Sequence, residues 1–116
     1  MTTDDAASPE VVFLAAVESL SGDPRVTGGT GFGSSPGRRV NGRIFAMLVR
    51  SELVVKLPRR RVDALVESGI AQWFDAGKAR SMHEWASIGT VHGDMWPKLT
   101  LEAYEFVGLI GRTRRS

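Results

Sequence analysis

Three consecutive arginines, Arg59, Arg60 and Arg61, stand at a position where anion-binding chemistry is expected. They follow Pro58, which predicts the first turn of a helix, and Lys56 lies two residues before that proline. The N-terminal end of a helix carries roughly half a positive charge, so a cation there costs about 0.3–1 kcal/mol at low salt. A phosphate, a carboxylate or the acidic surface of a partner would offset that cost and accept from the free N–H groups. We therefore predict that Arg59, Arg60, Arg61 and Lys56 bind nucleic acid or another anion.

A second interpretation of the same arginines needs no ligand. Arg59 and Asp63 are four residues apart, which places them on one side of a helix as an ion pair, and the neighbouring arginines can be solvated. Consecutive residues also spread over about 200° of a helix surface, so three of them do not all face one ligand. The C-terminal Arg112, Arg114 and Arg115 form either a second basic patch or a soluble chain end.

Four residues between positions 83 and 94 have metal-ligand or acid–base chemistry: His83, Glu84, His92 and Asp94. No close pair of histidines places two imidazoles on one face, and a predicted strand separates His83 from His92. We therefore predict no metal site, no cofactor and no catalytic residue, and the serines include no G-x-S-x-G motif. The alternative hypothesis is a small-ligand-binding protein or enzyme that uses a pocket between sheet and helices near His83, Glu84 and His92.

The glycine-rich stretch at residues 28–35 resembles a phosphate-binding loop only in composition. It lacks the lysine of the Walker pattern, and its glycines do not have the G-x-G-x-x-G spacing of a dinucleotide-binding fold. A hairpin rather than a helix follows it. We predict a turn region here and exclude nucleotide binding.

Composition places the chain among ordinary globular domains. It has 116 residues, of which 42% are hydrophobic and 24% charged, with a formal net charge of +2 and no cysteine. A chain of this length fits one domain, and no apolar run approaches the ~20 residues that a membrane-spanning helix needs. The N-terminus is acidic where a secretory signal would be basic, so a cytoplasmic location is expected.

Periodicity and turn signals predict the elements that position these residues. Ser8 and Pro9 begin a helix, Asn41-Gly42 joins two strands as a hairpin, and Gly69 ends the arginine-bearing helix. Strands are expected at residues 38–40, 43–49, 52–57, 70–74 and 84–88, with a short one near 25–27. The predicted order is α-β-β-β-α-β-β-α, an α+β domain over residues 8–112. Its two layers are an antiparallel sheet of about five strands and helices on one face, with flexible termini at 1–7 and 113–116.

The last helix and the tryptophans carry two further predictions. Thr100 is expected to cap the helix, and its buried stripe is expected to contain Leu101, Tyr104, Val107 and either Ile110 or Leu109. The tryptophans are expected to pack in or around the core, and Trp96, beside a proline in an irregular stretch, is expected to be partly exposed.

Residues 42–69 resemble the N-terminal domain of TfoX/Sxy-type competence regulators and the related MmcQ/YjbR-like small proteins. The resemblance lies in the hairpin residues 42–46, the strand 52–57 and the helix that ends at Gly69, and it extends to Glu84-Trp85, Trp96-Pro97 and the last helix. It implies a small two-layer α+β domain of regulatory or DNA-binding type. Full-length TfoX-type proteins have a second, helical domain, which we do not expect within these 116 residues, and this puts a competence-regulator role in doubt. The leading hypothesis is therefore a non-enzymatic binding or regulatory module whose partner is nucleic acid or an acidic protein.

Overall fold

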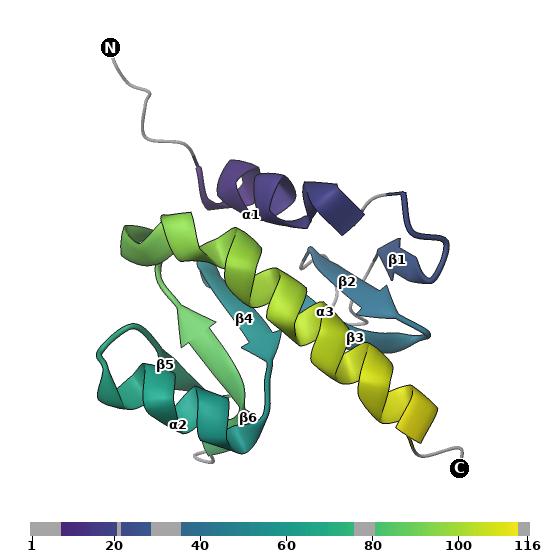
Figure 1. Ribbon diagram of the computed structural model, residues 1–116. Helices are drawn as coiled ribbons and strands as arrows, with labels where there is room; N and C mark the ends of the chain where they lie inside the picture. The colour runs from purple at the N-terminus through teal and green to yellow at the C-terminus, as the bar shows by residue number, and fades with distance from the viewer. Residues whose placement is uncertain (1–7, 21, 29–35, 76–80, 114–116) are drawn as a thin grey trace.

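The computed structural model describes residues 8–20, 22–28, 36–75 and 81–113, and their side chains except at 75, 81–83 and 110–113. The chain forms two layers, a sheet and a set of helices (Figure 1). In chain order the elements are α1 (Pro9–Val17), the 3₁₀ helix η1 (Glu18–Leu20), β1 (Val26–Gly28), β2 (Gly37–Val40), β3 (Arg43–Val49), β4 (Glu52–Lys56), α2 (Arg59–Glu67), β5 (Gln72–Asp75), β6 (Ser81–Ile88), the 3₁₀ helix η2 (Thr90–Met95) and α3 (Trp96–Thr113).

The sheet has six strands in the order β1-β2-β3-β4-β6-β5, and every neighbouring pair is antiparallel. The helices α1, α2 and α3 lie on one face of it, as Figure 1 shows. The predicted α+β class is therefore confirmed, with six strands rather than about five. The sixth strand is β1, the short strand expected near residues 25–27, and it pairs with the outer edge of β2 through Val26 and Val40. Among the described helices, none is both long enough and apolar enough to cross a bilayer.

Short backbone signals explain where the elements begin and end. Ser8 caps α1, because its Oγ accepts a hydrogen bond from the N–H of Val11 at 3.3 Å. Asn41 and Gly42 have φ values of 54° and 81°, as a type I′ hairpin turn requires. Gly69 has a φ of 85°, and its N–H donates to the carbonyl of Val66 just after α2 ends.

A β-bulge in β3 sets which side chains enter the main core. Arg38 pairs with Ala46 and Arg39 pairs with Ile44, so Phe45 is the extra residue. Phe45 and Ala46 are consequently both fully buried in the cluster under the helices, whereas alternation alone would send them to opposite faces.

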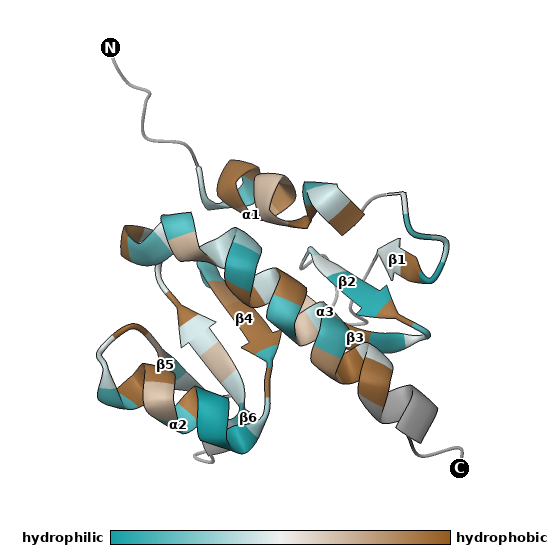
Figure 2. Ribbon diagram, in the orientation of Figure 1, coloured by the Kyte–Doolittle hydropathy of each residue, from teal (hydrophilic) through white to brown (hydrophobic). Residues whose placement is uncertain are grey.

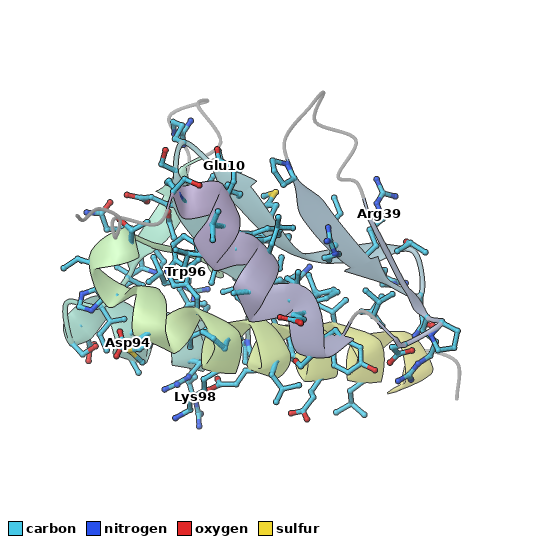
Figure 3. All side chains as sticks on the ribbon, turned by 90° about the horizontal axis from the view of Figure 1, so that it is seen from above. Glu10, Arg39, Asp94, Trp96 and Lys98 are labelled. Atoms are coloured by element: carbon cyan, nitrogen blue, oxygen red, sulfur yellow. The ribbon has the colours of Figure 1, made fainter. Side chains whose placement is uncertain are left out.

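Trp96 lies at the centre of the main core. It is fully buried, and Figure 3 shows its side chain between α3 and the sheet, with Lys98 directed away. The indole Nε1 donates to the carbonyl of Gly89 at 3.2 Å, which satisfies its one polar group. The expectation that Trp96 would be partly exposed was wrong, because it is the first residue of a helix and not part of an irregular stretch. Trp73 is the exposed tryptophan instead, at 38%.

The last helix begins at Trp96, five residues before Leu101, the first helical residue that a cap at Thr100 predicts. Thr100 does not cap it but lies within α3, fully buried. Leu101, expected in the buried stripe, is 42% exposed. Starting the helix at Trp96 gives the stripe that the structure shows, formed by Trp96, Leu99, Thr100, Ala103 and Val107.

A smaller apolar cluster lies on the sheet face opposite the helices. It contains Met47, Val54 and Phe74, and the partly buried side chain of Trp85 packs against it. The guanidinium carbon of Arg50 lies 5.8 Å from the centre of the Phe74 ring. Cations therefore cover part of this aromatic surface.

Candidate functional site

The first turn of α2 carries the arginine cluster. Its N-cap residue is Pro58, which offers no side-chain hydrogen bond, and the first turn contains no acidic residue. The first N–H groups of a helix have no acceptor inside the helix, so this end remains a donor of hydrogen bonds. Figure 2 shows the start of α2 as strongly hydrophilic, where the chain enters it from β4.

Arg59 and Arg60 are both exposed. Within the described ranges, neither of them forms an ion pair or a side-chain hydrogen bond. The pairing of Arg59 with Asp63 that the sequence allowed is not formed. Asp63 Oδ1 instead accepts a hydrogen bond from Trp73 Nε1 at 3.2 Å.

Arg61 is already occupied by a partner within the chain. Its Nε and Nη2 donate to Oε1 and Oε2 of Glu102 at 2.9 and 3.1 Å. The two side chains are 35% and 29% exposed. Arg61 therefore ties α2 to α3 and does not point toward a ligand beside Arg59 and Arg60.

Lys56 is also engaged. Its Nζ lies 3.8 Å from Glu84 Oε1 and 5.8 Å from the centre of the Trp85 ring. The four predicted anion-binding residues thus divide into two pairs. Arg59 and Arg60 have no ionic partner in the described part of the chain, whereas Arg61 and Lys56 each contact a glutamate.

The structure does not bring Glu84 and His92, the described side chains of the alternative site, together. Glu84 lies beside Lys56, and His92 lies beyond the other end of β6. The four residues from Glu84 to the end of that strand span about 13 Å at ~3.3 Å per residue. The side chain of His83 is outside the described residues. Among those that are described, no three His, Cys, Asp or Glu side chains form a metal-binding group.

A polar network that the sequence did not indicate connects the loop before β1 to α3. Arg25 donates from Nη2 to Asp23 Oδ2 at 3.0 Å and from Nε to Oδ1 at 3.2 Å. The hydroxyl of Tyr104 donates to Asp23 Oδ2 and accepts from Arg25 Nη2. The only available signal was the turn Asp23-Pro24-Arg25, since Tyr104 lies 81 residues beyond Asp23.

The electrostatics of this network follow from its hydrogen bonds. Donation from the Arg25 side chain, and then from the Tyr104 hydroxyl, holds the pKa of Asp23 well below its usual range. The same bond to Asp23 raises the pKa of Arg25, and donation to Asp23 together with desolvation raises that of Tyr104. A cavity of about 290 Å³ adjoins the network. We interpret the network as a structural connection, because its donors and acceptors satisfy one another.

The remaining sequence predictions concern residues beyond the described ones. The glycine-rich stretch is described only at residue 28, the first of its residues, and the side chains of Arg112, Arg114 and Arg115 are outside the described set. Comparison of the chain with protein-family models, with curated proteins and with solved structures finds no match.

Proposed function

We propose that this chain is a non-enzymatic binding module that holds an anionic partner, with nucleic acid as the first candidate, at the start of α2. The observation that carries the proposal is the pair Arg59 and Arg60. Both are exposed, neither has an ionic partner in the described part of the chain, and both lie at an uncapped helix N-terminus. The helix dipole disfavours these two cations, and no described acidic side chain neutralises them. A phosphate or carboxylate that binds there would stabilise them.

The chemistry of the pair sets the expected kind of binding. Phosphate contacts position a protein on nucleic acid but do not read sequence. Two arginines that each neutralise one phosphate give a slope of about −1.8 for log affinity against log salt on duplex DNA. Binding through this surface should therefore be weak, sequence-independent and sensitive to salt. The resemblance of residues 42–69 to TfoX-type N-terminal domains supports a regulatory module of this kind.

The test is a titration of a labelled DNA duplex at several salt concentrations. Arg59→Ala/Arg60→Ala should weaken binding and bring the salt slope close to zero. Arg43→Glu is the matched control, because it lowers the net charge by the same two units at an exposed position on the β2–β3 hairpin. It should leave the slope unchanged.

Two other outcomes of this titration would indicate either a different binding surface or a partner other than nucleic acid. If the double variant keeps the wild-type slope, the contact lies at another basic surface, and an Arg112→Ala/Arg114→Ala/Arg115→Ala variant tests the C-terminal end. If wild-type protein does not bind duplex or single-stranded DNA even at low salt, nucleic acid is rejected. The Arg59→Ala/Arg60→Ala variant and its control Arg43→Glu then serve in a search for an acidic protein partner.

A further inference from the structure

Three connections of the fold meet at the end of the sheet that is opposite to the start of α2. These are the β3–β4 turn, the loop from α2 to β5 and the chain leaving β6 toward η2 (Figure 1). They enclose a cleft of about 200 Å³, whose polar side chains are Glu52, Gln72, Ser87 and His92. This is room for several water molecules, or for one small organic group.

Glu52 provides the charge of this cleft. Its Oε1 accepts a hydrogen bond from the hydroxyl of Ser87 on the neighbouring strand. Its Oε2 lies beside Gly89, 3.9 Å from the point where a Cβ would stand. Within the described ranges Glu52 forms no ion pair, and no Lys or Arg is among the residues that line the cleft. A partly buried carboxylate without a cationic partner is unfavourable, and a bound cation would offset that cost.

The other lining groups suit a donor-rich ligand. The amide oxygen of Gln72 and an unprotonated imidazole nitrogen of His92 both accept hydrogen bonds. The apolar wall of the cleft is formed by Ile70, Ala71 and Val91. A divalent metal ion is a poor occupant, because the described residues offer no group of three His, Cys, Asp or Glu side chains.

We propose that this cleft is a binding site for a small organic cation, an alkylamine or alkylguanidine, with Glu52 as the counter-charge. The ammonium or guanidinium group donates to Glu52, with Gln72 and His92 as further acceptors. The alkyl part lies against the apolar wall. This site is independent of the arginines of α2, which lie at the other end of β4 and β6.

The test is a titration of ¹⁵N-labelled protein with butylammonium and ethylguanidinium, followed by amide chemical shifts. One charge-assisted contact in a small open cleft should give a dissociation constant on the order of 1 mM. We expect saturable shifts at the amides of residues 69–72 and 89–92. Propionate, which has the opposite charge, should not produce them.

Two variants and one control make the result specific. Glu52→Gln keeps the shape of the side chain and should weaken binding at least tenfold. Gly89→Ala narrows the cleft beside Oε2 without strain, because its Cβ would meet only ordinary contacts, and it should weaken binding several-fold. Glu105→Gln, at an exposed carboxylate that lines the other cavity, should bind as wild type does.

Some results would overturn the proposal. Shifts that fail to saturate, or equal binding by Glu52→Gln, would show that the carboxylate holds no cation. If Glu52→Gln fails to fold, unimpaired binding by Gly89→Ala would be enough to show that the ligand does not bind in the cleft. Shifts produced equally by propionate would show that charge does not select the ligand.

Discussion

Arg61 of α2 and Glu102 of α3 are joined side by side by two hydrogen bonds, at 2.9 and 3.1 Å. Because of this contact, Arg61 has a different role from Arg59 and Arg60. An arginine that contacts both carboxylate oxygens is held in a fixed orientation, and it also balances the charge of the acid. The arginine cluster therefore consists of one structural residue and two residues available to a partner.

Arg61→Ala should lower the free energy of unfolding by about 0.5–1 kcal/mol, and no more, because both side chains are about one-third exposed and solvent screens the pair. Urea unfolding of Arg61→Ala, Glu102→Gln and the double variant measures the coupling. Arg60→Ala removes a cation from the same helix end that has no described ionic partner, so as the contrast it should not lower stability. A coupling energy near zero would contradict a stabilising role for this contact.

The turn between β3 and β4 contains two non-glycine residues in the left-handed region, Arg50 with φ 51° and Ser51 with φ 68°. Ser51→Gly should raise the free energy of unfolding by about 0.5–1 kcal/mol, because glycine adopts this conformation without steric cost. Chemical denaturation measures the change.

The equivalent position of the other hairpin supplies the control for that prediction. Gly42 has φ 81°, and a Cβ there would meet nothing within 4 Å. Gly42→Ala should therefore destabilise the protein through the backbone alone, by about 1 kcal/mol. A Ser51→Gly variant less stable than wild type would show that the serine side chain contributes more than the strain costs.

Signals that are local in the sequence predicted much of this fold. Three local signals each specify a backbone conformation through a side chain or the lack of one, and the structure shows all three. They are Ser8 before Pro9, Asn41-Gly42 and Gly69. Such features depend only on residues that are close in the sequence, so they can be predicted from a single sequence.

Features that depend on distant residues were not predictable in the same way. Arg61 is paired with a glutamate 41 positions later, whereas the sequence offered only the local partner Asp63. Trp96 is buried in a cluster to which α1, α3 and the sheet all contribute residues, and the sequence around Trp96 contains none of those partners from α1 and the sheet. The cleft at Glu52 combines three segments that lie far apart in the sequence, so nothing in the order of residues around Glu52 pointed to it.

Asp23 should make stability depend on pH in the acid range. An unfolded aspartate titrates near pH 3.9, and the hydrogen bonds from Arg25 and Tyr104 hold the folded pKa of Asp23 below that value. The ionised carboxylate therefore contributes stability that is fully present above about pH 4 to 5. This contribution is lost as the pH falls through the unfolded pKa toward the folded one.

Asp23→Asn should remove that contribution. The free energy of unfolding, measured by urea titration between about pH 2 and 6, should fall less steeply with decreasing pH than in wild type. Asp94→Asn is the control, since Asp94 is exposed and forms no ion pair with a described residue. Parallel pH profiles for wild type and Asp23→Asn would show that the network leaves the proton affinity of Asp23 unchanged.

Thr100 places a hydroxyl in the main core without a partner. The residue is fully buried, and among the described side chains its Oγ1 is the buried polar atom that has no hydrogen bond. A buried polar group without a partner costs about 1–3 kcal/mol. Thr100→Val keeps the shape and removes the hydroxyl, so it should raise the free energy of unfolding by about 1 kcal/mol and the melting temperature by about 4 °C.

Thr100→Ser separates the hydroxyl from the methyl group. It keeps the unpaired hydroxyl and removes a buried methyl, so it should lower the free energy of unfolding by about 1 kcal/mol. Calorimetry of the three proteins should therefore rank them Val, Thr, Ser in decreasing stability. A Thr100→Val variant that melts below wild type would mean that the hydroxyl has a partner in solution, such as a buried water. The hydroxyl of Thr100 would then have a structural role in the middle of the apolar stripe.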